Sequence, residues 1–247
     1  MLIPMLAAGI VVFLTHALEA VTGFGCAVLA MPFLTALLGM RRGIIIITIL
    51  SWFLALYMVI SKRKQLNFLQ FGVICGCTAV GLPLGMYLFR TFDTVFLKKL
   101  LGLFIIIASA WQLLLRLGYK NSKKSGIVQG VKLLPYYGLL VLGGIVHGMF
   151  STGGPLVVIY ASRALPDKGQ FRATLCLLWA VLNTVIIGVY LFEGSITPPI
   201  AGTTGLLVPF VVFGIIAGEK IHHKVNEQIF SVIVFSMLLV TGFFMFL

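Results

Sequence analysis

Residues 22–25, Thr-Gly-Phe-Gly, and residues 151–155, Ser-Thr-Gly-Gly-Pro, each follow a long apolar stretch and precede a short one. Glycines release the backbone from helical geometry, and Pro155 suits the first turn of a new helix, where its missing N–H costs no hydrogen bond. Unwound backbone at membrane depth is tolerated only when it is buried in protein or lines a wet cavity. We therefore predict a broken or re-entrant helix at each of the two places, with a cavity beside it.

The chain around these breaks has the composition of a membrane protein. Of its 247 residues, 60% are hydrophobic and only 10% are charged, and the mean hydropathy is +1.13. Soluble proteins carry roughly 25% charged residues, so a soluble body with one anchor is excluded. The net charge of +12 lies mainly in loops, so it indicates membrane orientation and not binding to nucleic acid. No basic region precedes the first apolar stretch, and we expect no removable signal peptide.

The apolar segments follow the order long, short, long, long, long, and this order occurs twice. They run over residues 2–21, 26–39, 43–60, 68–89, 100–117, 133–149, 155–165, 173–191, 200–218 and 229–247. A hydrocarbon core needs about 20 helical residues, so 26–39 and 155–165 are too short to span it alone. The predicted fold is an all-α integral membrane protein with two repeats, each a broken or re-entrant helix pair plus three transmembrane helices.

Matching landmarks in the two halves support a duplication. Gly25 corresponds to Gly154 and Arg42 to Arg172, at nearly constant offsets. The pairs Gly81/Gly85 and Gly214/Gly218 also correspond; small residues at this spacing let helices approach closely, and we interpret them as packing positions. Asp93 and Asn226 are predicted helix N-caps. The predicted domains are repeat 1–117, a basic cytoplasmic linker at 118–132 and repeat 133–247.

Loop charges indicate how the two repeats face the membrane. If each break makes a hairpin without a net crossing, the loops at 62–64, 116–132, 163–172 and 220–224 share one side, which then carries 13 of the 18 Lys and Arg residues. If each break belongs to a single crossing, the division is 10 against 8. Because basic residues gather on the cytoplasmic side, the first arrangement is favoured. It makes the repeats inverted and puts both termini outside.

The start of a short helix at each break suits an anion. Such a helix presents free N–H groups and about half a positive charge, and hydroxyls of Thr22, Ser151 and Thr152 lie close by in sequence. Asn183, in the middle of a span, either lines the same pathway or bonds a neighbouring helix. The predicted anion-binding residues are Thr22, Gly23, Phe24, Gly25, Ser151, Thr152, Gly153, Gly154, Pro155 and Asn183. A kink without any ligand is the alternative.

Two ionisable residues lie within the spans near the breaks. Glu19 precedes Gly25 by six residues and His147 precedes Gly154 by seven. An ionisable residue inside a span is a functional candidate, and a proton carried by either one would supply a driving force. The alternative is that they only hydrate the cavity or bond a neighbouring helix. Cys26, Cys75, Cys77 and Cys176 all lie in apolar segments and are interpreted as packing residues, so we expect no metal and no cofactor.

With these motifs in view, the chain resembles the TauE/SafE family of membrane transporters, also called the sulfite exporter or toluene-sulfonate uptake permease family. The resemblance covers nearly the whole chain and rests on the two glycine-rich breaks, on Phe171-Arg172-Ala173-Thr174 and on the paired glycines. It implies a multi-pass secondary carrier of sulfite, sulfonates and related organic anions in a bacterial plasma (inner) membrane. Phe24 and Cys26 stand where that family often has glycine, which leaves the anion open.

The predicted function is therefore secondary-active transport of a small anion by alternating access, with protons as a candidate coupling ion and the lipid bilayer as surroundings. An anion channel of the same architecture is the first alternative, because broken helices also line channels. An intramembrane enzyme is the second, but the sequence has no Gly-x-Ser-x-Gly, no His-Glu-x-x-His and no second acid near Glu19, so we predict no enzyme. A homodimer is left open.

Overall fold

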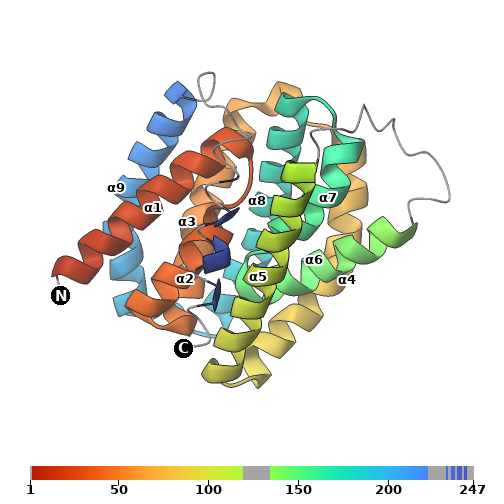
Figure 1. Ribbon diagram of the computed structural model, residues 1–247. Coiled ribbons are helices and arrows are strands. Elements are labelled where there is room, and N and C mark those ends of the chain that lie inside the picture. The colour runs from red at the N-terminus through yellow and green to blue at the C-terminus, as the bar shows by residue number, and fades with distance from the viewer. Residues whose placement is uncertain are drawn as a thin grey trace.

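The structure is a computed structural model, and it describes residues 2–118, residues 134–221 and a few positions between 232 and 243. Within these residues every regular element is a helix (Figure 1). The helices of the first half are α1 (Leu2–Thr22), α2 (Cys26–Leu38), α3 (Met40–Ser61), the short 3₁₀ turn η1 (Arg63–Gln65), α4 (Phe68–Thr91) and α5 (Thr94–Gly118). Those of the second half are α6 (Leu134–Phe150), α7 (Gly154–Ala164), α8 (Lys168–Phe192) and α9 (Pro198–Ile221).

Six of these helices are long and apolar enough to cross a membrane, namely α1, α3, α4, α5, α8 and α9. Many of their outward side chains are large and apolar, for example Leu69 at 73% exposed and Val80 at 71%. Lipid is the environment in which such side chains are stable. The fold class predicted from the sequence, an all-helical membrane protein, is thus confirmed. The predicted linker at 118–132 lies almost wholly outside the described residues, and so does more than half of the predicted last span at 229–247.

Two helices begin earlier than the hydropathy pattern predicts. The carboxylate of Asp93 accepts a hydrogen bond from the backbone N–H of Phe96 at 2.8 Å, and Asp167 accepts one from Gln170 at 2.8 Å. These caps satisfy N–H groups in the first turn, so α5 begins at Thr94 and α8 at Lys168, several residues before the apolar runs. The predicted cap at Asp93 is confirmed. Arg172, predicted in a basic loop, instead lies on α8 and is only 6% exposed.

The paired glycines bring the two halves into contact. A Cβ on Gly81 or Gly85 of α4 would collide with backbone carbonyl oxygens of α6. A Cβ on Gly214 of α9 would lie 2.7 Å from the carbonyl oxygen of Phe13 on α1, and a Cβ on Gly218 would lie closer still to that of Ala17. Helix α4 therefore packs on α6 and α9 packs on α1, while α3 and α8 lie side by side in the centre (Figure 1). The predicted packing role of these glycines is confirmed.

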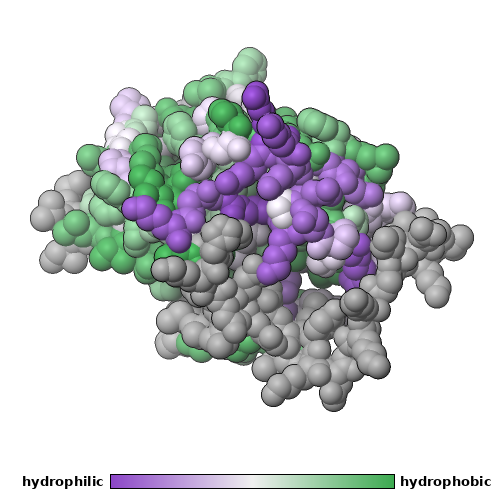
Figure 2. All heavy atoms as spheres, turned by 90° about the horizontal axis from the view of Figure 1, so that it is seen from above, coloured by the Kyte–Doolittle hydropathy of each residue, from purple (hydrophilic) through white to green (hydrophobic). Residues whose placement is uncertain are grey.

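The polar ends of the helices gather at two opposite ends of the bundle. At the end that is uppermost in Figure 1, Lys62 forms an ion pair with Glu219 at 3.2 Å, and Gly169 lies against the side chain of Gln65. Seen from above, this end carries a concentration of hydrophilic residues (Figure 2). At the opposite end, Arg90 is paired with Glu193. The described parts of the loops that the charge pattern grouped together thus lie at one end; which compartment that end faces stays a prediction.

Candidate functional site

The first break depends on glycine for conformation and for space. Gly23 and Gly25 have φ angles of 83° and 109°, in the left-handed region that L side chains rarely adopt. A Cβ on Gly23 would also lie only 2.8 Å from Cα of Arg172 on α8. The chain therefore leaves α1 at Thr22, turns through the two glycines and enters α2 at Cys26.

The second break is built differently, around a serine. Ser151 has a φ of 53° and is the one non-glycine residue of the described chain with a positive φ. Its hydroxyl is 2.6 Å from that of Thr48 on α3, so a bond across the molecule holds the strained residue in place. Gly153 packs closely against the carbonyl oxygen of Gly143, and α7 begins at Gly154 with Pro155 in its first turn, as the sequence predicts.

The N-terminus of α2 is occupied by a side chain of the same protein. The carboxylate of Glu19 accepts a hydrogen bond from the backbone N–H of Cys26 at 2.8 Å. Glu19 is 3% exposed. A carboxylate is a favourable partner for the positive end of a helix. The sequence predicted free N–H groups at the starts of both short helices; at α2 the first of them is engaged by Glu19.

The N-terminus of α7 has no side-chain cap, and unpaired polar groups lie beside it. Thr152 is 1% exposed, and its hydroxyl has no hydrogen-bond partner among the described residues. His147 is 2% exposed; one ring nitrogen lies 3.0 Å from the amide oxygen of Asn183, and the other is unpaired in the same sense. Buried polar atoms are almost always hydrogen-bonded, so two orphans at one helix start indicate a place for a polar ligand.

A small cavity joins the two breaks. Its lining residues come from both halves of the chain and are Glu19, Gly25, Cys26, Ala27, Val28, Ser51, His147, Ser151, Thr152, Gly154, Trp179 and Asn183. We call this space the break pocket. Its volume is about 20 Å³, which is room for about one water molecule. The conformation described is therefore closed around the pocket, and a sulfite-sized anion would require it to widen.

The structure brings half of the ten predicted anion-binding residues together in one pocket; Gly23 and Gly153 shape the breaks beside it, and three exceptions lie elsewhere. Gly25, Ser151, Thr152, Gly154 and Asn183 line the break pocket with the two proton-coupling candidates, and Gly153 supports the second break. The exceptions, Thr22, Phe24 and Pro155, line a neighbouring apolar cavity instead. The hydroxyl of Thr22 is also satisfied, because it donates to the carbonyl oxygens of Leu18 and Phe24.

Trp179 on α8 was missed by sequence reasoning, although it connects the two breaks. Its indole N–H donates to the carbonyl oxygen of Gly23 at 3.1 Å. Its ring stacks on His147, with ring centroids 5.2 Å apart. Ser51 and Cys26 were missed as well; the thiol lies 3.0 Å from the Ser51 hydroxyl. A tryptophan in the middle of an apolar span gives no sign in the sequence of which backbone carbonyl it reaches.

Among the described residues, no group of three or more His, Cys, Asp or Glu side chains is placed to hold a metal ion. The groups that line the pocket are hydroxyls, a carboxyl, an amide and an imidazole around a helix start. Such groups bind an oxyanion through N–H and O–H donors and can take up or release protons beside it.

Comparisons with known proteins agree with this arrangement. Residues 8–245 match the family described as "Sulfite exporter TauE/SafE". One curated relative is the "Probable inner membrane transporter protein TsaS" of Comamonas testosteroni, which is 25% identical over 162 residues. That match covers 64% of this chain and 63% of the relative. No solved structure matches the chain. The family match extends over nearly all of the sequence, through both breaks and the spans around them, and the chain belongs to the TauE/SafE family of membrane transporters.

Proposed function

We propose that the protein is a secondary-active transporter of a small oxyanion, with sulfite or a simple sulfonate as the substrate class, and that the anion binds in the break pocket at the start of α7. The observation that carries the proposal is the pair of unpartnered polar groups there, the Thr152 hydroxyl and the second ring nitrogen of His147. The Thr152 hydroxyl and the free N–H groups of α7 offer an anion several hydrogen bonds in a site with little water. The Nε2 of His147 faces the amide oxygen of Asn183, so the unpaired ring nitrogen is a donor to the anion when the imidazole takes up a proton.

Glu19 gives the proposal its coupling step. Its carboxylate lines the same pocket and holds the start of α2. An anion entering a space this small would be repelled by an ionised carboxylate, since two like charges a few ångströms apart interact strongly when little water separates them. Uptake of a proton by Glu19 removes the repulsion. Proton and anion therefore bind together, and an inward proton gradient drives anion uptake.

The helix contacts support alternating access by inverted repeats at 1–117 and 133–247. The fourth helix of the first half packs on the first helix of the second, and the fourth helix of the second half packs on the first helix of the first. Exchange of equivalent partners is what a twofold relation between the halves requires. The relative's name, an inner membrane transporter, supports the same location for this chain.

Transport of labelled sulfite into proteoliposomes tests the proposal. Thr152→Val removes the hydroxyl but keeps the shape of the side chain; losing one hydrogen bond to a charged ligand costs about 1.5–3 kcal/mol, so KM for sulfite rises roughly 10-fold or more. Thr203→Val is the matched control, because the Thr203 hydroxyl is exposed and bonds only its own helix. A Thr152→Val protein with the wild-type KM, or uptake that does not saturate, contradicts the proposed site or the carrier mechanism respectively.

A further inference from the structure

A second, larger cavity lies at the end of the bundle opposite the basic loops. Its volume is about 230 Å³, roughly tenfold that of the break pocket. The polar residues that line it are Arg41, Arg42, Arg90, Tyr190, Glu193 and Ser195. We call it the arginine vestibule. None of these residues belongs to the break pocket, and the proposed function makes no use of them.

The vestibule carries an excess of positive charge. Arg90 is paired with Glu193. Arg41 bonds only the neutral carbonyl oxygens of Arg90 and Phe92, and its guanidinium lies over the ring of Phe89. Arg42 is exposed and makes no hydrogen bond or ion pair with any described residue. Three arginines against one carboxylate leave a net charge of two positive units on the wall, so the cavity attracts anions.

The fixed groups suit an oxyanion more than a simple halide. Guanidinium groups present parallel N–H donors that match two oxygens of a sulfonate, sulfite or phosphate group. The hydroxyl of Ser195 and the phenol of Tyr190 add donors on the same wall. The N–H donors of Arg42 are therefore available to a ligand, whereas Arg90 is already paired with Glu193.

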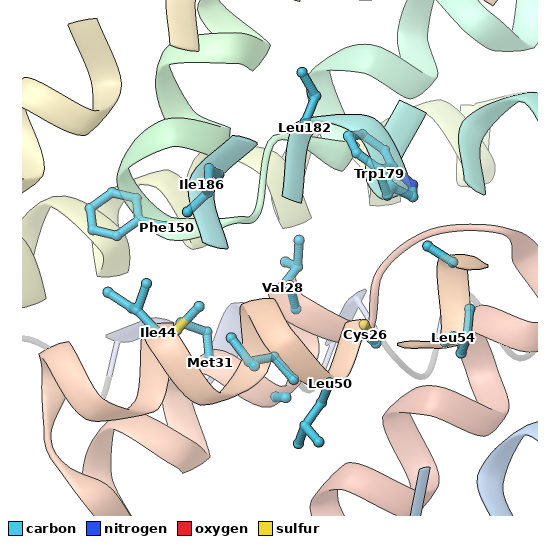
Figure 3. Packing of buried hydrophobic residues seen from close by; sticks show 14 of the residues in the cluster. Cys26, Val28, Met31, Ile44, Leu50, Leu54, Phe150, Trp179, Leu182 and Ile186 are labelled. Atoms are coloured by element: carbon cyan, nitrogen blue, oxygen red, sulfur yellow. The ribbon is translucent and has the colours of Figure 1, made fainter. Parts of the chain in front are cut away.

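An apolar layer separates the vestibule from the break pocket. On α8, Tyr190 lines the vestibule and Asn183 lines the pocket, about 10 Å apart along the helix. Ile186 lies between these two residues on α8, and Figure 3 shows it near Phe150 and Ile44; all three are at most 1% exposed. On α6, Gly148 borders the vestibule and its neighbour His147 borders the pocket. The two spaces are therefore neighbours along α6 and α8, separated by buried side chains.

We infer that the arginine vestibule is a second anion site, which holds a small water-soluble oxyanion before the apolar layer opens to the break pocket. The position along the path rests on the proposed function; the site itself does not. An anionic lipid headgroup has the same chemistry as a free oxyanion. The test must therefore separate a soluble ion from a lipid.

Thiol labelling of Ser195→Cys in lipid nanodiscs measures the charge of the vestibule without any transport. The rates of an anionic sulfonatoethyl thiosulfonate reagent and of its cationic trimethylammonium counterpart are compared, with the chain that lacks the reporter cysteine as the blank. We expect the anionic reagent to react at least tenfold faster. Arg42→Gln should slow the anionic reagent by about fivefold and so lower this ratio, since one unit charge near the thiol in water contributes about 1 kcal/mol for each reagent. Arg63→Gln, an exposed arginine beyond the other end of α3, is the matched control and should leave the ratio unchanged.

Two further arms identify the ligand. Free methanesulfonate should slow labelling by the anionic reagent when Arg42 is present, and should have no such effect in Arg42→Gln. This protection should be the same in phosphatidylcholine discs with and without phosphatidylglycerol. Equal rates for the two reagents, a ratio unaffected by Arg42→Gln, or protection by phosphatidylglycerol alone overturns the inference. Sulfite transport is measured separately. If the protein transports sulfite but labelling shows no charge selectivity, the proposed function stands and the vestibule site is wrong. If labelling is charge-selective but sulfite is not transported, the vestibule site stands and the proposed function is wrong.

Discussion

At the scale of single residues, Trp179 links the first break to a side chain beside the second. It bonds the carbonyl oxygen of Gly23 at the first break and stacks on His147 beside the second. The hydrogen bond to Gly23 crosses between the two halves of the chain, and the stacking on His147 lies within the second half. A side chain that holds both breaks fixes their separation, and the shape of the break pocket depends on that separation.

Replacing Trp179 with phenylalanine separates these two contacts. Trp179→Phe keeps a ring that can stack on His147 and loses the hydrogen bond to Gly23, which leaves a buried carbonyl oxygen unpaired at a cost of about 1–3 kcal/mol. We expect sulfite uptake at low substrate to fall about tenfold while the purified protein stays monodisperse. Trp52→Phe is the control, because Trp52 also bonds through its indole, to Thr184, but lies outside the pocket. Equal activity of the two variants would remove Trp179 from the site.

Glu19 differs from the other acids of the described chain in its surroundings. It is buried at the start of α2 and faces the break pocket. An amide in its place can still accept the hydrogen bond from the N–H of Cys26, but it cannot bind or release a proton.

Glu19→Gln therefore tests coupling without removing the cap. We expect the variant to keep sulfite exchange at equal pH on both sides and to lose the acceleration, about tenfold, that an inward proton gradient gives the wild type. Asp167→Asn is the matched control, since asparagine also caps helices and Asp167 lies at the start of α8, away from the pocket. Gradient-driven uptake that survives in Glu19→Gln would assign coupling to His147 or to another ion.

The sequence predicted the backbone part of the site and missed most of its tertiary part. Gly23, Gly25 and Gly154 were found because glycine next to an apolar run is a local signal. The anion-binding role of Thr22 stays a prediction; its hydroxyl donates to the nearby backbone carbonyl oxygens of Leu18 and Phe24, which the sequence alone does not show. Trp179 and Ser51 reach the pocket only through packing of α8 and α3 against the breaks, which no local pattern shows.

At the scale of elements, the contact of α4 with α6 depends on the absence of side chains. Gly81 and Gly85 let the carbonyl oxygens of Val141 and Ile145 approach the α4 backbone. Helices that approach this closely gain dispersion contacts over their whole length.

Gly85→Ala should force α4 and α6 apart. Overpacking of this kind costs about 1–3 kcal/mol, and we expect the midpoint of thermal unfolding in detergent to fall by roughly 2 to 10 °C. Gly76→Ala is the control on the same helix, because a methyl group there meets open space. Alanine also favours the helix over glycine, so Gly76→Ala should be neutral or slightly stabilising. A similar loss in both variants would mean that α4 and α6 do not depend on this contact.

The order of long and short helices was predictable, because the length of an apolar segment is set by the thickness of the membrane. The exact ends of the helices were not predictable in this way. The short segments at 26–39 and 155–165 agree with α2 and α7 within a residue or two. The starts of α5 and α8 were placed too late, because Asp93 and Asp167 begin helices within polar sequence. Arg172 was consequently assigned to a loop, although the helix carries it into the protein interior.

At the scale of the whole molecule, the two ends of the path differ in the state of their arginines. At one end Arg42 is exposed in the arginine vestibule. At the other end its predicted counterpart Arg172 is buried and paired with Glu219, which also binds Lys62. One end is hollow, and the other carries an ion-pair cluster that we propose seals it. If the halves are inverted repeats, transport exchanges these two conditions, and the sealed end opens when the vestibule closes.

Glu219→Gln should shift this balance toward opening of the sealed end. Removing the carboxylate leaves both Arg172 and Lys62 without their ion-pair partner. Breaking a buried pair in this way destabilises the closed conformation by about 3–5 kcal/mol. Opening this end would let water hydrate Arg172 and so relieve that cost. Met58 reports the change, because it is fully buried and its sulfur lies 3.4 Å from the Arg172 guanidinium. In a Met58→Cys protein, we expect a membrane-impermeant thiol reagent to react at least tenfold faster after Glu219→Gln.

Glu193→Gln is the matched control for that measurement, since Glu193 also pairs with an arginine but at the vestibule end. It should leave the reactivity of Met58→Cys unchanged. A tenfold change corresponds to about 1.4 kcal/mol between the two states, which is less than the loss expected from breaking the pair. A rate that is the same with and without Glu219 would therefore mean that apolar packing seals this end, and that the ion pair follows the conformation without controlling it.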